Sequence, residues 1–176
     1  KKTKLPAIPR AHKLDHKTVR LIDKNLSQAN IILGNLGIDR KNPDYYAVVV
    51  MNYILGGGGF SSRMMGHIRD DQGLAYSVSS HFDARLYPGS FQASLQTKNV
   101  SAMPAIQGLL AEIKKIREKP VADHELEDAK AFLIGNFPLR LDTSSKMSHL
   151  LATIEFYGLG LDYFEKYPKL IQRITK

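Results

Sequence analysis

The stretch GGGGFSSRMMGHIRDDQGLAY, residues 56–76, joins four consecutive glycines to three basic side chains, Arg63, His67 and Arg69, and ends on Tyr76. Glycine has no Cβ atom, so four in a row let the backbone take positive φ or lie close against another segment. A helix end and a turn explain one or two of these glycines. The other glycines favour a functional role for the stretch.

A phosphate-binding loop is the first function that such a glycine run suggests. Exposed backbone amides before a helix do favour anions. However, no GKS or GKT follows the glycines, and they come after a predicted helix, whereas nucleotide-binding loops follow a strand. We therefore interpret the run as a flexible segment that approaches another segment closely or lets the following helix shift.

The residues before the glycine run predict two strands and a helix. TVRLID, residues 18–23, alternates apolar and polar side chains, and QANIILGNLG, residues 28–37, has the composition of a second strand. The short turn between them indicates an antiparallel pair. Residues 45–55 then place apolar side chains at helical spacing until the glycines end the helix.

The residues after the glycine run predict a short helix, a hairpin and four further helices. Ser61 or Ser62 is expected to cap a helix over 63–71 that Gly73 ends. Two segments rich in β-favouring residues flank Pro88-Gly89 and predict a long hairpin. Pro168 is expected to kink the last helix or to limit its start. The four helices are expected at residues 102–118, 123–137, 143–157 and 163–174. The predicted fold class is α+β, an antiparallel sheet with helices packed on one face.

Composition limits the classes of protein that the chain can belong to. Its 176 residues, 43% of them hydrophobic and 24% charged, are enough for one domain with a real core, and no apolar run is long enough to span a membrane. With no cysteine there is no disulfide, thiolate nucleophile or cysteine-ligated zinc. The charge of +8 is scattered among acids, which favours a solvated basic surface over nucleic-acid binding.

The two ends of the chain suggest how the domain is bounded. Residues 1–17 begin KKTKLPAIPR, which is basic and contains two prolines but has no apolar stretch after it, so we interpret them as a linker rather than a signal peptide. The domain is then expected over 18–176. Because the sequence ends in IQRITK with no closing turn, we expect the domain to be truncated at its C-terminal end.

A short segment near the start of the sequence resembles a zinc-binding motif. HKLDH, residues 12–16, has two histidines four residues apart with an acid between them, as in H-x-x-E-H. Here the acid is Asp15, one methylene shorter than glutamate, and there is hardly room for one helical turn. The remaining histidines show no ligand spacing. No G-x-S-x-G is present, and the acids of ADHELEDAK, residues 122–130, suit the first turn of a helix. We therefore predict no metal site and no hydrolytic centre within this chain.

The run ILGGGGFSSRMMGHIRDDQGLAYSVSS resembles the second, non-zinc-binding domain of the pitrilysin/insulinase (M16) family of zinc metallopeptidases, which includes the mitochondrial processing peptidase. VRLIDKNLSQANIILGNLGI resembles the opening strands of that domain, PDYYAVVVMNYILGGG its first helix, and ELEDAKAFLIGNFPLRLDT its later helices. The resemblance extends over nearly the whole chain, from Val19 to Ile174. It implies one half of a clamshell made of two related α+β halves.

The resemblance also implies roles for particular residues. In the family, one half binds zinc through H-x-x-E-H, and the other supplies an arginine and a tyrosine, seven residues apart, that reach the substrate backbone. Arg69 and Tyr76 match that pair in residue type, spacing and position. The alternatives are a surface salt bridge for Arg69 and a core position for Tyr76. The glycine segment would line the edge where the halves meet and the peptide threads. Its expected substrate-binding residues are Gly56, Gly57, Gly58, Gly59, Phe60 and Ser61.

The chain departs from the whole enzyme because it has no H-x-x-E-H. We expect no cofactor in this chain, zinc in the partner half, and an unfolded peptide as substrate. The alternatives are a catalytically silent assembly subunit, like the core proteins of the respiratory bc1 complex, and a peptide-binding module without catalysis. The kind of relative that it resembles favours a bacterial periplasm or cell envelope over the cytoplasm.

Overall fold

A computed structural model describes residues 15–176 of the chain. Within these residues three strands form one antiparallel sheet in the order β1-β3-β2. The strands are β1 (Gln28–Leu36), β2 (Ser77–Phe82) and β3 (Ser90–Lys98). The central strand β3 pairs with β1 from Gln28↔Lys98 to Leu36↔Ser90. The β2–β3 hairpin expected around Pro88-Gly89 is confirmed by its antiparallel ladder.

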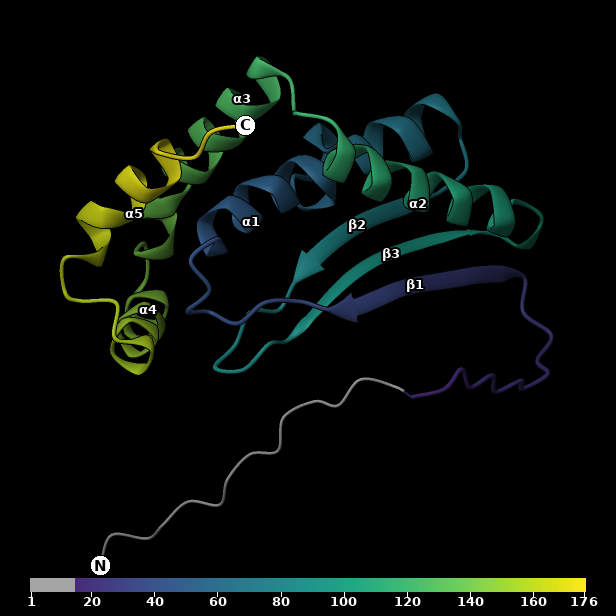
Figure 1. The fold of residues 1–176 in the computed structure, drawn as a ribbon, viewed down its shortest axis with the longest axis horizontal. Coiled ribbons are helices and arrows are strands. Elements are labelled where there is room, and N and C mark those ends of the chain that lie inside the picture. The colour runs from purple at the N-terminus through teal and green to yellow at the C-terminus, as the bar shows by residue number, and fades with distance from the viewer. Residues whose placement is uncertain (1–14) are drawn as a thin grey trace, which may run out of the picture.

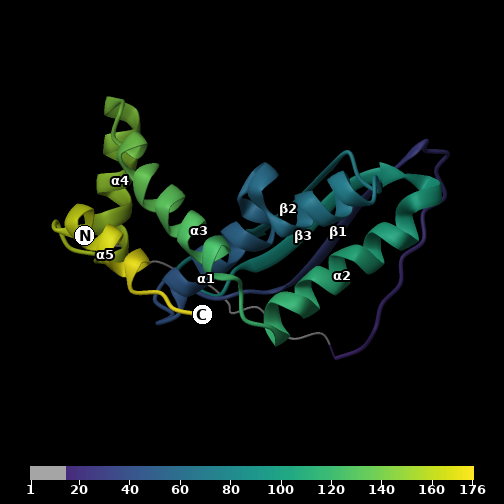
Figure 2. The same cartoon turned by 90° about the horizontal axis from the view of Figure 1, so that it is seen from above.

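The helices cover one face of the sheet and extend beyond one end of it (Figure 1). In Figure 2, α1 and α2 lie over the strands, while α3, α4 and α5 gather at one end. The α-helices are α1 (Tyr45–Asn52), α2 (Ala102–Glu118), α3 (Asp123–Gly135), α4 (Ser144–Tyr157) and α5 (Tyr163–Gln172). The expected α+β class, with an antiparallel sheet and helices on one face, is confirmed.

Shorter helical turns connect these elements. Two are π-helical, Tyr53–Gly57 directly after α1 and Met65–Asp71 after the glycines. Three are 3-10 turns, at Gly59–Ser61, Asn99–Ser101 and Phe137–Arg140. Among the described residues no helix is long and apolar enough to cross a bilayer.

The core consists of two clusters of buried side chains. One lies between the sheet and α2 and includes Leu55, Met64, Ile68, Val78, Leu95 and Leu109. The other lies among the helices and includes Val50, Ile54, Leu126, Phe137, Ile154, Tyr167 and Ile171. Residues 53–71 join the two, because Ile54 belongs to the helical cluster and its neighbour Leu55 to the sheet cluster.

Two local predictions are wrong, and a third is narrowed to one of its two alternatives. Residues 18–23 form no strand and no pair with β1, and their apolar side chains are exposed, because no element covers them. Neither Ser61 nor Ser62 caps the next helix with its side chain, and the Ser62 hydroxyl donates instead to the Gly59 carbonyl, at 2.7 Å. Pro168 lies inside α5, five residues after its start, so it does not limit that start, and the kink stays a prediction. His12 of the zinc-like motif, with most of the expected linker, lies outside the described residues.

Candidate functional site

The glycine segment is held against the sheet at Gly56. This residue is buried, and a Cβ placed on it would lie 2.6 Å from the Ser80 backbone nitrogen and 2.9 Å from the Met64 sulfur. The Ser80 hydroxyl donates to the side-chain oxygen of Asn52 at 2.8 Å, and Asn52 Nδ2 donates to the Ser80 carbonyl at 3.3 Å. Gly56 therefore permits the end of α1 to lie directly against β2.

The other three glycines of the run also have local reasons to be glycine. A Cβ on Gly57 would meet Asn52 Nδ2 at 2.6 Å, and one on Gly58 would meet the Tyr53 carbonyl oxygen at 2.7 Å. Gly59 has φ of +59° and no neighbouring atom within 4 Å of a Cβ, so its backbone conformation alone favours glycine. Close packing explains Gly56, Gly57 and Gly58, and backbone conformation explains Gly59. A helix end and a turn alone would explain only one or two of these four glycines.

Phe60 and Ser61 stand at the exposed tip of the segment. The Phe60 side chain lies in the 3-10 turn and is 75% exposed, whereas phenylalanine side chains are usually buried. The guanidinium carbon of Arg69 lies 5.2 Å from the centre of the Phe60 ring, a distance at which a cation and an aromatic face attract each other. The structure therefore brings Phe60 and Arg69 together.

Arg69 sits near the end of the π-helical turn Met65–Asp71, whose Ile68 is fully buried. Its side chain is 37% exposed, and Nη1 donates to the carboxylate of the adjacent Asp70 at 3.1 Å. An exposed pair between neighbouring residues contributes little to stability. The guanidinium is thus presented to solvent on a segment that is anchored by its opposite face.

Tyr76 lies at the entry to β2 and is 52% exposed, so the alternative of a core tyrosine is wrong. Its backbone N–H donates to the Gln96 carbonyl at 2.9 Å, which fixes the main chain while the ring remains accessible. Gly73, with φ of +61°, turns the chain between Arg69 and Tyr76. In the described part of the chain, Tyr76 makes no hydrogen bond or ring contact with Arg69 or Phe60.

A polar cleft of about 720 Å³ opens beside the glycine segment. Phe60 and Ser61 form part of its wall, and α3 contributes Glu125. Arg63 also lines the cleft, and its Nε and Nη2 donate hydrogen bonds to the two carboxylate oxygens of Glu125, both at 2.5 Å. These bonds are the main reason that the pKa of Glu125 falls to about 2 and that the pKa of Arg63 is raised. The sequence contains both residues but gives no sign that they pair, because 62 positions separate them.

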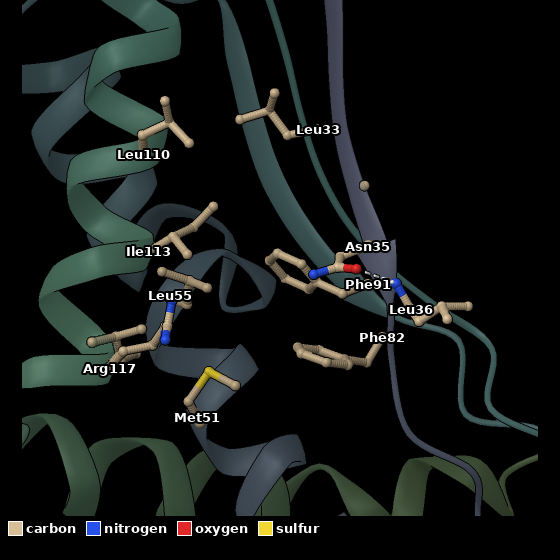
Figure 3. A pocket seen from close by; sticks show the side chains of 12 residues that line it. Leu33, Asn35, Leu36, Met51, Leu55, Phe82, Phe91, Leu110, Ile113 and Arg117 are labelled. Carbon is tan, nitrogen blue, oxygen red and sulfur yellow. Dashed lines mark hydrogen bonds between the residues drawn. The ribbon is translucent and has the colours of Figure 1, made fainter. Parts of the chain in front are cut away.

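A second cavity, of about 610 Å³, is lined mainly by apolar side chains, together with Asn35 and Arg117 (Figure 3). It lies between α2 and the strands, with Phe82 and Phe91 on one side and Leu110 and Ile113 on the other. None of the expected site residues belongs to it. Phe60 and Ser61 line the polar cleft, whereas Arg69 and Tyr76 line neither of these two cavities.

The outer edge of β2 is partly closed. An open edge strand could accept an extended peptide by adding it to the sheet. At Ser80, however, Asn52 already bonds the carbonyl, and Gly56 packs against the amide. This part of the edge is closed by the end of α1 and the turn after it.

The described residues contain no group of three or more histidine, aspartate or glutamate side chains that could hold a metal ion. His67, the histidine nearest the site, instead lies 2.8 Å through Nδ1 from a carboxylate oxygen of Glu112 on α2. Arg69 and Tyr76 are the two predicted catalytic residues, and each carries a group that can donate a hydrogen bond.

Comparison with known proteins identifies the family. Residues 1–133 match the model of the peptidase M16 inactive domain. The chain is 38% identical over 168 residues to the non-peptidase homolog YmxG of Helicobacter pylori, covering 92% of this chain and 37% of that protein. It is 34% identical over 133 residues to an uncharacterized zinc protease, YmxG, of Bacillus subtilis, covering 71% of this chain and 31% of that protein.

A solved structure agrees with these matches. The peptidase M16 inactive domain from Pseudomonas fluorescens superposes with a TM-score of 0.78 at 34% identity, over 85% of this chain and 36% of that one. The chain therefore belongs to the peptidase M16 family and is its inactive domain, as the resemblance predicted. It spans about a third of the length of the relatives it matches.

Proposed function

We propose that this domain is the non-zinc half of a zinc-dependent endopeptidase, in which Arg69 and Tyr76 bind the carbonyl of an unfolded peptide substrate. The zinc, bound through H-x-x-E-H, belongs to the other half of the whole protein or to a partner subunit. Two related halves would then enclose the substrate between them.

The observation that carries the proposal is that both side chains are exposed although their backbones are fixed. Arg69 follows the buried Ile68, and the Tyr76 amide is bonded into the sheet. A guanidinium and a phenol hydroxyl are hydrogen-bond donors that can hold a carbonyl oxygen and stabilise the negative charge that develops on it near a metal. Donors on a rigid backbone need little reorganisation when substrate arrives.

The glycine segment would contribute the rim of the chamber. Gly57, Gly59, Phe60 and Ser61 are exposed and can contact a peptide. Gly56 is buried, so its part in substrate binding would be indirect, through the position of the exposed tip. The edge of β2 before Ser80 is the part of the hairpin that could still accept an extended peptide.

The second candidate function is a catalytically silent assembly subunit of the same fold. The name of the Helicobacter pylori relative, a non-peptidase homolog, favours it. The name of the Bacillus subtilis relative, a zinc protease, favours the first. A silent subunit has no need of an exposed arginine and tyrosine at this spacing, which supports the peptidase.

The test uses the full-length protein with any partner, assayed for zinc content and for cleavage of an unstructured peptide with and without chelator. We expect bound zinc and cleavage that chelator abolishes. Arg69→Ala should lower kcat by about 100- to 1,000-fold, the usual effect of losing one donor to a developing oxyanion. Tyr76→Phe should also lower kcat while the fold stays intact. Unchanged turnover in both variants would refute the roles of this pair, and absence of zinc and cleavage would favour the assembly subunit.

A further inference from the structure

Two side chains of the segment that carries Arg69 each contact a glutamate on a neighbouring helix. We call residues 63–71 the Arg69 segment. Arg63 and His67 are four residues apart and so lie on the same side of this helical segment. Arg63 binds Glu125 of α3 through two hydrogen bonds of 2.5 Å, and His67 lies 2.8 Å from Glu112 of α2.

Glu125 is itself fixed in place. Its second oxygen accepts a hydrogen bond of 2.8 Å from the backbone N–H of Ala122 at the start of α3. The Arg63 side chain is only 9% exposed and that of Glu125 only 21%, so water screens their pairing weakly. This ion pair therefore joins the Arg69 segment to the first turn of α3 with a defined geometry.

The face of the Arg69 segment next to Arg63 and His67 is apolar. Met64 and Ile68 are fully buried in the cluster between the sheet and α2. Apolar packing, the Arg63–Glu125 ion pair and the contact between His67 and the Glu112 carboxylate leave the segment little freedom to rotate about its axis. Arg69 follows Ile68 by one residue, so the rotation of the segment determines where its guanidinium points.

Stability alone does not account for this cluster. Arg63 Nη1 and Glu112 Oε2 are buried and have no hydrogen-bond partner among the described residues. A buried charged group with an unpaired donor or acceptor costs free energy, and apolar residues of similar size often stabilise a protein as well or better. The Arg69 segment is also π-helical over Met65–Asp71, a rare geometry that occurs frequently at functional sites.

We propose that Arg63 and His67 are positioning residues: through Glu125 and Glu112 they fix the rotation of the Arg69 segment and so hold the Arg69 guanidinium over the Phe60 ring. This proposal rests on the proposed function in one respect, because it takes the direction of Arg69 to matter for substrate binding. The positioning itself can be measured without any peptidase activity.

The experiment compares Arg63→Gln with Arg85→Gln in the full-length protein. Arg85 forms an exposed ion pair with Asp83, so the control makes the same chemical change where no helix is tied down. The first readout is the NMR signal of the Arg69 Nε–H group, which the nearby Phe60 ring shifts. Arg69→Lys identifies this signal by its loss, and Phe60→Leu shows its position without the ring. The second readout is amide hydrogen exchange.

In Arg63→Gln we expect the Arg69 signal to move toward its position in Phe60→Leu. Exchange of the amides of residues 65–73 should quicken by about tenfold or more, the factor expected from losing one charge-assisted hydrogen bond. The amides of β3 and the Arg85→Gln control should not change. An Arg69 signal that stays in place while exchange rises evenly over the whole domain would overturn the proposal, because the pair would then serve only stability.

If Arg63→Gln does not fold, Glu125→Gln and the milder Arg63→Lys give the same comparison, with the same expected shift and the same contrary result. Peptide turnover, measured separately, distinguishes the two proposals. If Arg69→Ala leaves turnover unchanged, the proposed function fails even where the Arg69 signal moves. A signal that stays in place, with turnover that depends on Arg69, refutes the positioning alone.

Discussion

Replacing Gly56 with alanine should destabilise the domain, and the same change at Gly66 should not. A Cβ on Gly56 would lie 2.6 Å from the Ser80 nitrogen, 2.7 Å from the Ser80 hydroxyl and 2.9 Å from the Met64 sulfur. The nitrogen belongs to β2, and the hydroxyl is bonded to Asn52 at 2.8 Å, so neither can move freely. At Gly66, within the Arg69 segment, a Cβ would have no neighbouring atom within 4 Å.

The expected magnitude at Gly56 follows from three effects. Overpacking a core costs about 1–3 kcal/mol, and losing the hydrogen bond between Ser80 and Asn52 costs about 1 kcal/mol more. The better helix propensity of alanine returns about 1 kcal/mol. The net loss in the free energy of unfolding is therefore about 2 kcal/mol. At Gly66 only the last effect acts, so Gly66→Ala should stabilise the fold by about 0.5–1 kcal/mol.

Urea denaturation of the wild type and both variants, followed by far-UV circular dichroism, measures the difference. A loss of about 2 kcal/mol should lower the urea midpoint by about 1 M, and Gly66→Ala should raise it slightly. If Gly56→Ala is as stable as the wild type, the end of α1 does not lie against β2 as described. If both variants lose stability equally, helix flexibility rather than close packing explains the glycines.

Two further predictions concern the ion pair and the helical core. The pKa of Glu125 is lowered from 4.5 to about 2, so its ion pair stabilises the fold fully above about pH 5, and this contribution, on the order of 3 kcal/mol, is lost as the pH falls toward 2. Urea midpoints measured between pH 6 and pH 3 should fall less steeply in Glu125→Gln than in the wild type, and equal slopes would contradict the pairing. Phe137→Ala removes a buried ring stacked 4.1 Å from Tyr167 and should cost about 3–5 kcal/mol. Because Phe137 belongs to the helical cluster and β3 contributes to the sheet cluster, hydrogen exchange should quicken in α3 and α5 but not in β3; an equal rise in both would show a single cooperative core.

Local signals in the sequence predict most of the elements correctly. Lys119-Pro120 ends α2 where the pattern indicates, and Gly158, with φ of +64°, ends α4. The hairpin follows from Pro88-Gly89 and the β-favouring residues beside it. In each case the residues that determine the boundary lie within a few positions of it.

The errors arise where a distant element decides the outcome. Residues 18–23 have the alternation of a half-buried strand, but a strand also needs a neighbour to pair with, and no described element supplies one. The strand propensity of residues 18–23 does not reveal whether a pairing partner exists. The contact of Gly56 with Ser80, and that of Arg63 with Glu125, join residues 24 and 62 positions apart, so neither leaves a pattern in a single sequence.

The glycine run therefore does not distinguish a peptidase half from a silent subunit. Gly56 is required wherever the end of α1 lies against β2, and an assembly subunit that keeps the fold keeps that contact. Phe60, Arg69 and Tyr76 differ from Gly56, because their side chains are exposed and do not form part of the buried core. These side chains can be changed with little damage to the fold, so their effect on turnover, rather than the presence of the glycines, decides between the two functions.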